Sequence, residues 1–282
     1  MLQITRLEPV DYLMIGHLTV DLTEQGPLIG GTAAYSALTA RALGLRVGIV
    51  TAWGGEISLA PFGDIPIAGL NAPVSTTFKN VYTPTGRTQT IIDVAPKLEM
   101  EHIPEPWRQA AIVHLGPVAQ EMDTSLIRQF PASLIGLTPQ GWMRSWNAQG
   151  RVIPTTWTQA SIVLKYAGAA VIGLEDIQHD EELLEEMVDS CAVFAATEGA
   201  QGVRLFWNKD VRRFRPPRMD EVDSTGAGDI FAAAFFVRLY ATRDPWEAAR
   251  FATELSAFSV TRRGLVGIPT QDEIKKCMVE VL

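Results

Sequence analysis

Residues 222–237 read VDSTGAGDIFAAAFFV, and in this stretch two carboxylates, Asp223 and Asp229, stand on either side of a glycine pair. From Ile230 onward the apolar residues recur at positions i, i+3, i+4 and i+7. That spacing places them on one face of a helix, so the stretch predicts a tight turn followed by a buried helix. The two carboxylates lie at the point where the turn becomes the helix.

Gly226, Ala227 and Gly228 fall in the first turn of this predicted helix. Because their side chains are small, an anion can approach the exposed N–H groups, and the helix dipole favours its negative charge. The chain contains no P-loop pattern G-x-x-x-x-G-K-[ST], and the stretch lacks the dinucleotide pattern G-x-G-x-x-G. The three residues therefore predict an anion hole of another kind.

Asp229 lies in the same first turn, where the dipole and nearby N–H donors predict a carboxylate that stays ionised near neutral pH. A carboxylate beside an anion hole can take a proton from a hydroxyl while that oxygen attacks a phosphoryl group. A plain structural alternative is that Asp223 or Ser224 caps the helix and the glycines only allow close packing. We predict that Asp229 is the base and that Asp223 positions the turn.

The rest of the chain alternates predicted strands and helices. A strand that begins near residue 11 and ends at Gly16, a helix at 30–44 and a strand at 45–55 predict a right-handed βαβ crossover and a parallel sheet. Residues from about 72 to 103 instead alternate polar residues with β-branched and aromatic ones, as a small sheet does. We predict an α/β fold: one domain over 1–282, with a doubly wound, mostly parallel sheet, helices on both faces and a small β lid inserted at about 72–103.

The composition excludes several classes of function. The 282 residues are 47% hydrophobic and 20% charged, with a net charge of −8, so we expect a globular protein that binds neither nucleic acid nor a membrane. Cys191 and Cys277 lie too far apart for a zinc pattern and are too few for a disulfide framework. Residues 1–16 lack a signal-peptide pattern and no apolar run approaches about 18 residues, so we expect a cytoplasmic protein.

The ordered motifs of the chain resemble those of the ribokinase-type (PfkB) carbohydrate kinases. The stretch DSTGAGD at 223–229 is similar to the family pattern D-[ST]-x-G-A-G-D, and it is preceded by TEGAQG at 197–202 and followed by AFSVTRRG at 257–264. The resemblance implies a ribokinase-like fold. It also implies an ATP-dependent kinase that transfers the γ-phosphate to a hydroxyl of a small sugar or cyclitol, with ATP bound toward the C-terminal half near residues 257–264.

The resemblance also implies roles for single residues. Asp229 looks like the catalytic base, within the anion hole described above. Asp21, Gly30 and Gly31 resemble the substrate-binding positions, although Asp21 by itself also fits a solvated residue at a strand end. The resemblance places a further set near the ATP phosphates and ribose, where a plain turn is the alternative: Thr197, Gly199, Gly202 and Thr225.

Residues 173–176 depart from the family, which has N-x-x-E where this chain reads Gly-Leu-Glu-Asp. Magnesium is implied by ATP chemistry, held through water by Asp176 or by Glu175. Both carboxylates equally fit the solvated start of an acidic segment. Activation by a monovalent cation stays open.

Two further departures lie on the predicted substrate side. Tyr35 stands where many relatives have asparagine, and its ring fits either stacking on a substrate or core packing. The segment TPQGWMR at 138–144 resembles a D-x-Q-G-x-x-R-like segment of the inositol-kinase-like branch, with Thr138 in place of the aspartate. Gln140 and Arg144 would then bind a polyhydroxylated ring.

Two alternatives remain at this point. One is a nucleoside kinase of the same fold, and the other is a non-catalytic sensor that binds a nucleotide or polyol on the same scaffold. The expected partners are ATP and a small sugar or cyclitol, and the chain is expected to be a monomer or a homodimer joined through its lids.

Overall fold

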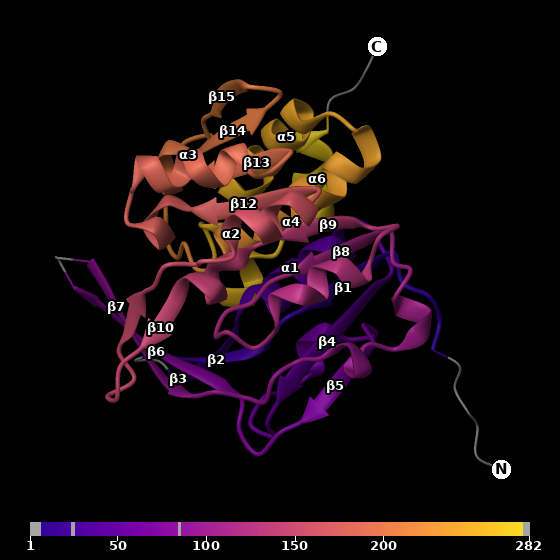
Figure 1. The fold of residues 1–282 in the computed structure, drawn as a ribbon, viewed down its shortest axis with the longest axis vertical. Coiled ribbons are helices and arrows are strands. Elements are labelled where there is room, and N and C mark those ends of the chain that lie inside the picture. The colour runs from indigo at the N-terminus through magenta and orange to yellow at the C-terminus, as the bar shows by residue number, and fades with distance from the viewer. Residues whose placement is uncertain (1–6, 24–25, 84–85, 279–282) are drawn as a thin grey trace.

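A large twisted sheet runs through the centre of the computed structural model, which describes residues 7–23, 26–83 and 86–278 (Figure 1). The strand order is β15-β14-β13-β12-β9-β8-β1-β4-β5. All neighbours from β13 to β5 pair in parallel, whereas β14 and β15 pair antiparallel at one edge. The strands are β1 (Tyr12–Ile15), β4 (Val47–Trp53), β5 (Ile67–Asn71), β8 (Ile112–Leu115), β9 (Leu134–Leu137), β12 (Ala169–Gly173), β13 (Val193–Thr197), β14 (Val203–Trp207) and β15 (Asp210–Phe214).

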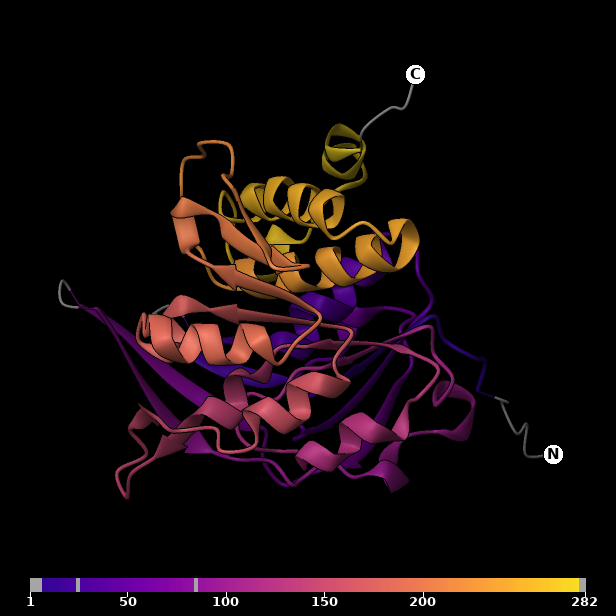
Figure 2. The same cartoon turned by 45° about the horizontal axis from the view of Figure 1, so that its top comes forward.

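Helices cover both faces of this sheet, because its strands are apolar on both sides. Tyr12 and Met14 of β1 belong to one buried cluster, and the intervening Leu13 belongs to another on the opposite face. The first cluster includes α1 (Thr32–Ala42), α4 (Ala227–Thr242), α5 (Pro245–Ser259) and α6 (Gln271–Cys277). The second includes α2 (Ala160–Val163) and α3 (Glu181–Asp189), and Figure 2 shows α4 and α5 side by side.

The predicted βαβ order is confirmed: α1 connects β1 to β4, which pair in parallel. The first strand ends at Gly16 as predicted, since β1 stops at Ile15. The chain then enters a second sheet as β2 (Thr19–Thr23), a strand that was not predicted. Within the part of the chain that the structure describes, no helix has both the length and the apolar character needed to cross a membrane. Residues 1–6, on which part of the signal-peptide expectation rests, and 279–282, the end of the last predicted helix, lie outside the described residues.

The second sheet forms the lid, in the order β3-β2-β6-β7. β6 (Thr76–Thr83) and β7 (Gly86–Asp93) lie inside the predicted range 72–103, whose residues 84–85 are outside the described chain. β2 and β3 (Gly26–Gly30) come from the N-terminal part, so that range was too narrow: the lid is assembled from two segments. We propose that lid and large sheet form one domain.

A short hairpin joins the lid to the body of the molecule. Its strands, β10 (Arg144–Trp146) and β11 (Val152–Pro154), lie beside β7, where the Ile91 N–H donates to the Gly150 carbonyl over 2.8 Å (Figure 1). Trp146 and Val152 pack against the lid residues Phe78 and Ile91. The hairpin therefore fixes the position of the lid over the ends of the parallel strands.

Candidate active site

Asp223 ties the loop before α4 to the segment after α5. Its Oδ1 accepts from the Thr225 N–H over 2.9 Å and its Oδ2 from the Gly264 N–H over 3.0 Å. The N–H groups of Val222 and Asp223 also donate to the Val260 carbonyl. Asp223 thus holds the turn in place, as its sequence position predicts, and leaves the chemistry to another residue.

The two glycines of the loop have different structural roles. Gly226 is the N-cap of α4 with φ of +80°, and a Cβ there would lie 2.3 Å from the ring of Tyr35. Gly228 has no atom within 4 Å of the position of a Cβ, so its backbone is open toward the cavity. Gly226 therefore serves the turn and its packing. The Ala227 N–H donates to the Ser224 carbonyl over 3.2 Å, so Gly228 leaves room for an anion at the N–H groups that follow Ala227.

Tyr35 is only 2% exposed and packs beneath Gly226. Of the two roles that the sequence left open for this ring, the buried position favours packing. A stacking contact with a substrate stays a prediction for the edge of the ring that faces the cavity.

Asp229 points to the N-terminus of α1. The Thr32 hydroxyl donates to Oδ1 of Asp229 over 2.7 Å, and the Ser36 hydroxyl donates to the Asp229 carbonyl over 3.2 Å. Thr32 was not among the predicted site residues, because nothing near position 32 shows that the chain 197 residues further on comes back to it. The carboxylate is therefore held by a partner on another helix.

Burial raises the pKa of Asp229 to about 6, and the hydrogen bond from Thr32 opposes this rise. Asp176 and Asp21 raise the pKa further, while Arg144 lowers it. The carboxylate was expected to stay ionised near neutral pH, and a pKa of about 6 agrees with this. The largest influence on the pKa is the loss of water around the carboxylate, which the sequence did not predict. A carboxyl group with a pKa near 6 is still mostly ionised at pH 7, and it is a stronger base than an exposed aspartate.

Replacing Thr32 with Val is expected to raise the pKa of Asp229 further, because the hydrogen bond that lowers it is lost. Since the ionised form is the base, activity falls as the pH drops through this pKa, and the acid limb of kcat/KM should move to higher pH. For Thr32→Val we expect kcat/KM to be roughly three- to tenfold lower at pH 6 than at pH 8. Thr32→Ser keeps the hydroxyl and is the matched control; an acid limb that does not move in Thr32→Val would contradict this account.

The site residues line one cavity of about 1540 Å³ between the lid, the strand ends and the start of α4. Gly30 is the exception: a Cβ there would lie 2.1 Å from Oδ2 of Asp21, so Gly30 makes room for that carboxylate. The predicted residues that do line the cavity are Asp21, Gly31, Tyr35, Gln140, Arg144, Glu175, Asp176, Thr197, Gly199, Gly202, Thr225, Gly226, Ala227, Gly228 and Asp229. The lining also includes side chains that the sequence did not reveal: Thr19, Thr32, Phe78, Gln89 and Thr138.

Gln140 and Arg144 bind Asp176 in this structure. The Gln140 amide donates to Oδ1 of Asp176 over 2.7 Å, and Nη2 of Arg144 lies 3.4 Å from the same oxygen. The ion pair is largely buried, with side chains 14% and 16% exposed. The three residues expected to bind substrate and metal separately are therefore one cluster.

This cluster changes the expected magnesium site. Among residues 7–278 with their short gaps, no three His, Cys, Asp or Glu side chains gather as metal ligands. Glu175 is exposed on the cavity wall, whereas Asp176 already shares an oxygen with two donors. Mg²⁺ usually takes one or two carboxylates together with phosphate oxygens and water. The residues present fit an ion carried by the donor phosphates, with Glu175 better placed than Asp176 to reach it.

The turn at 197–202 is built mainly by backbone geometry. The Thr197 hydroxyl donates to the Ile172 carbonyl, and Gly202, with φ of +99°, would place a Cβ 1.9 Å from the Phe214 carbonyl oxygen. Both observations favour the structural alternative for this motif. Beyond the turn the cavity wall combines the apolar side chains of Pro216, Pro217, Met219, Ala257 and Val260 with the charged side chains of Arg218, Asp220 and Glu221.

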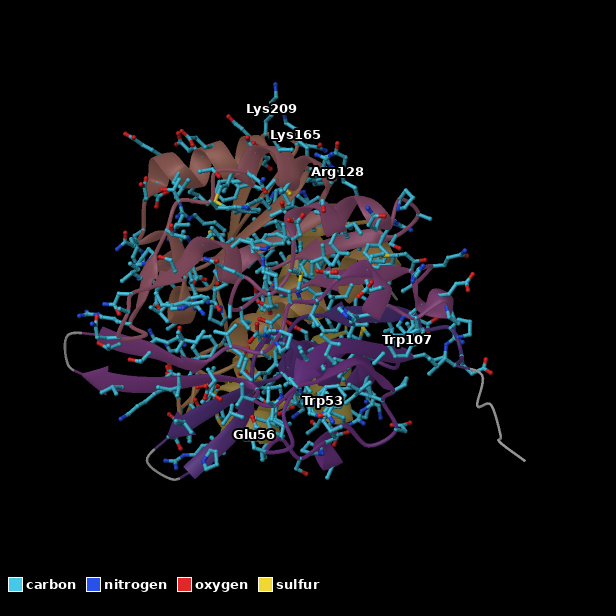
Figure 3. All side chains as sticks on the ribbon, turned by 60° about the horizontal axis from the view of Figure 1, so that its bottom comes forward. Trp53, Glu56, Trp107, Arg128, Lys165 and Lys209 are labelled. Atoms are coloured by element: carbon cyan, nitrogen blue, oxygen red, sulfur yellow. The ribbon has the colours of Figure 1, made fainter. Side chains whose placement is uncertain are left out.

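Charge on the cavity wall is strongly acidic. Among its described residues the lining contains the carboxylates of Asp21, Glu175, Asp176, Glu198, Asp220, Glu221 and Asp229, but two guanidinium groups, those of Arg144 and Arg218. Arg204 and Arg213 pair with Glu198 of this wall, whereas Figure 3 shows Arg128, Lys165 and Lys209 at the edge of the molecule. A phosphate-bearing ligand would therefore need a cation with it.

The sequence of the chain is similar to those of known kinases. The sequence profile described as pfkB family carbohydrate kinase matches residues 160–271. A cytidine kinase from Thermococcus kodakarensis is 24% identical over 87% of this chain and 94% of its own length. A ribokinase from Bacillus subtilis is 39% identical, over 29% of this chain and 28% of that one.

Solved structures share the fold. A pyrophosphate-dependent kinase in the ribokinase family, complexed with a pyrophosphate analog and myo-inositol, superimposes with a TM-score of 0.76 at 21% identity, over 95% of this chain and 100% of the other. The ribokinase of Thermotoga maritima gives 0.71 at 20% identity, over 95% and 99%. The predicted ribokinase-like α/β fold is confirmed.

Proposed function

We propose that the chain, whose residues 160–271 match the pfkB family of carbohydrate kinases, is a phosphotransferase that moves the γ-phosphate of ATP to a hydroxyl of a small sugar or cyclitol. The observation that carries the proposal is the geometry around Asp229. The Asp229 carboxylate, whose pKa is raised, lies in the same helical turn as Gly228, where the backbone is open to the cavity. This pairing serves to hold a hydroxyl and a phosphate against each other.

Asp229 orients the acceptor hydroxyl and receives its proton as the bond to phosphorus forms. The N–H groups at the start of α4 from Gly228 onward hold the transferring phosphate. Asp21, on the lid strand β2, would accept hydrogen bonds from other acceptor hydroxyls. Magnesium, when bound, neutralises phosphate charge, which the acidic wall of this cavity makes necessary.

The side chains on the cavity wall favour a nucleotide over pyrophosphate as the donor. The apolar wall formed by Pro216, Pro217, Met219, Ala257 and Val260 fits a flat base, whereas pyrophosphate would need several cations. The acidic lining likewise favours an uncharged acceptor. A nucleotide donor is consistent with a cytoplasmic enzyme, and a monovalent-cation requirement and lid-mediated dimer formation stay open predictions.

A nucleoside is the second candidate for the acceptor. It is favoured by the match to a cytidine kinase along nearly the whole of that relative. The apolar side chains Phe78, Val118, Met143 and Val152 on the lid side of the cavity also fit a base. Inositol-like acceptors are favoured by the myo-inositol complex of a structural neighbour. One acceptor panel separates these classes.

Acceptor-dependent consumption of each phosphate donor tests this proposal. The full chain with Mg²⁺ is incubated with ATP or pyrophosphate and with sugars, inositols or nucleosides, and ADP or orthophosphate formation that depends on the acceptor is measured. We expect turnover with ATP and none with pyrophosphate. Turnover with pyrophosphate alone would overturn the donor assignment. Thermal stabilisation by ligands without turnover for any pair would identify a non-catalytic sensor.

A further inference from the structure

Three polar side chains form a hydrogen-bonded row inside the large sheet. The Tyr12 hydroxyl lies 2.7 Å from Nδ1 of His114, and Nε2 of His114 lies 2.9 Å from Oγ1 of Thr138. Tyr12 and His114 are fully buried and Thr138 is 8% exposed. They belong to the adjacent strands β1, β8 and β9, with Thr138 directly after the last residue of β9.

The row has a direction, because the imidazole is neutral and each of its nitrogens has one role. Burial lowers the pKa of His114 to about 3 and raises the pKa of Tyr12 well above its usual value. One ring nitrogen must then donate and the other accept. Tyr12 also has a hydrogen bond with Ser36. With the Tyr12 hydroxyl as the donor to Nδ1, Nε2–H donates to Thr138.

Thr138 brings this row to the reacting end of the cavity. Its hydroxyl oxygen would lie 3.1 Å from a Cβ on Gly116, and Cγ2 of Thr32 would lie 2.6 Å from the same point. Thr138 therefore lies near Thr32, whose hydroxyl donates to Asp229, and both threonines line the cavity. The buried row of Tyr12, His114 and Thr138 therefore ends beside the predicted base, where it can orient a hydroxyl group in the cavity.

We propose that Thr138 orients the acceptor, with Tyr12 and His114 as positioning residues that act through it. Because a lone pair of Oγ1 is occupied by Nε2–H, the Thr138 hydroxyl hydrogen cannot point back to His114 and is directed into the cavity. It donates to an acceptor oxygen next to the hydroxyl that Asp229 holds. A hydroxyl at that place binds as a hydrogen-bond acceptor, and analogues lacking this oxygen bind poorly. The inference rests on the proposed kinase function.

A double-mutant cycle tests the proposal. Thr138→Val removes the hydroxyl at nearly constant volume and should raise KM for the acceptor about tenfold, with KM for ATP unchanged. Tyr12→Phe should raise the acceptor KM about threefold in the wild-type background and leave it unchanged in the Thr138→Val background. Thr138→Ser, which keeps the hydroxyl, should stay near wild type. Equal effects of Tyr12→Phe in both backgrounds would show a purely structural role and overturn the proposal.

The tautomer of His114 gives a readout that does not need turnover. ¹⁵N chemical shifts of the labelled full chain should show protonated Nε2 and unprotonated Nδ1 between pH 6 and 8. Protonation at Nδ1 instead would reverse the row and overturn the assignment of Thr138 as a donor. Absence of turnover in the wild type with this tautomer intact would count against the kinase function and not against the direction of the row.

Discussion

Asp229→Asn is expected to lower turnover by about 10³-fold while leaving ATP binding nearly unchanged. The amide keeps the shape of the side chain and can still accept the hydrogen bond from Thr32, but it cannot receive the proton of the acceptor hydroxyl. ATP affinity, measured by titration calorimetry, separates this loss from misfolding. Turnover within tenfold of wild type would remove Asp229 from its role as the base.

The same substitution is expected to stabilise the fold at neutral pH. The pKa of Asp229 is raised to about 6 in the folded chain, so folding favours the protonated form, and that contribution to stability is lost as the pH rises through about 6. Asn is neutral at every pH, so the cost of burying an ionised carboxylate is absent. Above pH 7 the free energy of unfolding should rise by about 1–3 kcal/mol. Thermal unfolding from pH 4 to 8 should show a gain in Tm over wild type that grows with pH. A gain independent of pH would contradict the burial argument.

Gly226→Ala is the second large effect, and it acts on structure as well as on activity. Alanine disfavours φ of +80°, and its Cβ would lie 2.3 Å from the Tyr35 ring. We expect a loss of roughly 2–3 kcal/mol in the free energy of unfolding and a turnover about 100-fold lower, because the anion-binding turn is displaced. Chemical denaturation and steady-state rates measure the two effects.

Gly228→Ala is the matched control on the same loop. Its Cβ would meet no atom within 4 Å and alanine favours the helix, so the free energy of unfolding should stay level or rise by about 0.5 kcal/mol. The methyl group would nevertheless stand where the phosphate approaches, and transfer should fall. Equal stability losses in the two variants would show that the packing of Tyr35 under Gly226 does not set the turn.

The fold followed from local patterns. Buried strands read as apolar runs, and the helix between β1 and β4 forced a parallel crossover. The lid was only half recognised, because β6 and β7 are long alternating strands, whereas β2 and β3 have five residues each and β3 contains a proline. Short strands gain their stability from the sheet they join, and that sheet is not visible in the local sequence.

The candidate site was predictable where a motif defines it and not where distant elements meet. The separate roles of Asp223 and Asp229 could be expected from the helix start. The partner of Asp229, Thr32, and the link between Gln140 and Asp176 depend on tertiary contacts. The rise in the pKa of Asp229 could not be predicted for the same reason, since burial is a property of the packed molecule.

Direct observation of phosphate transfer tests the central claim. ³¹P NMR of the full chain with ATP, Mg²⁺ and the best acceptor from the panel should show ADP and a new phosphomonoester in equal amounts. Asp229→Asn at the same concentration should leave the ATP signals unchanged. Formation of orthophosphate without an ester, or of the ester at wild-type rate by Asp229→Asn, would contradict a kinase site built on Asp229.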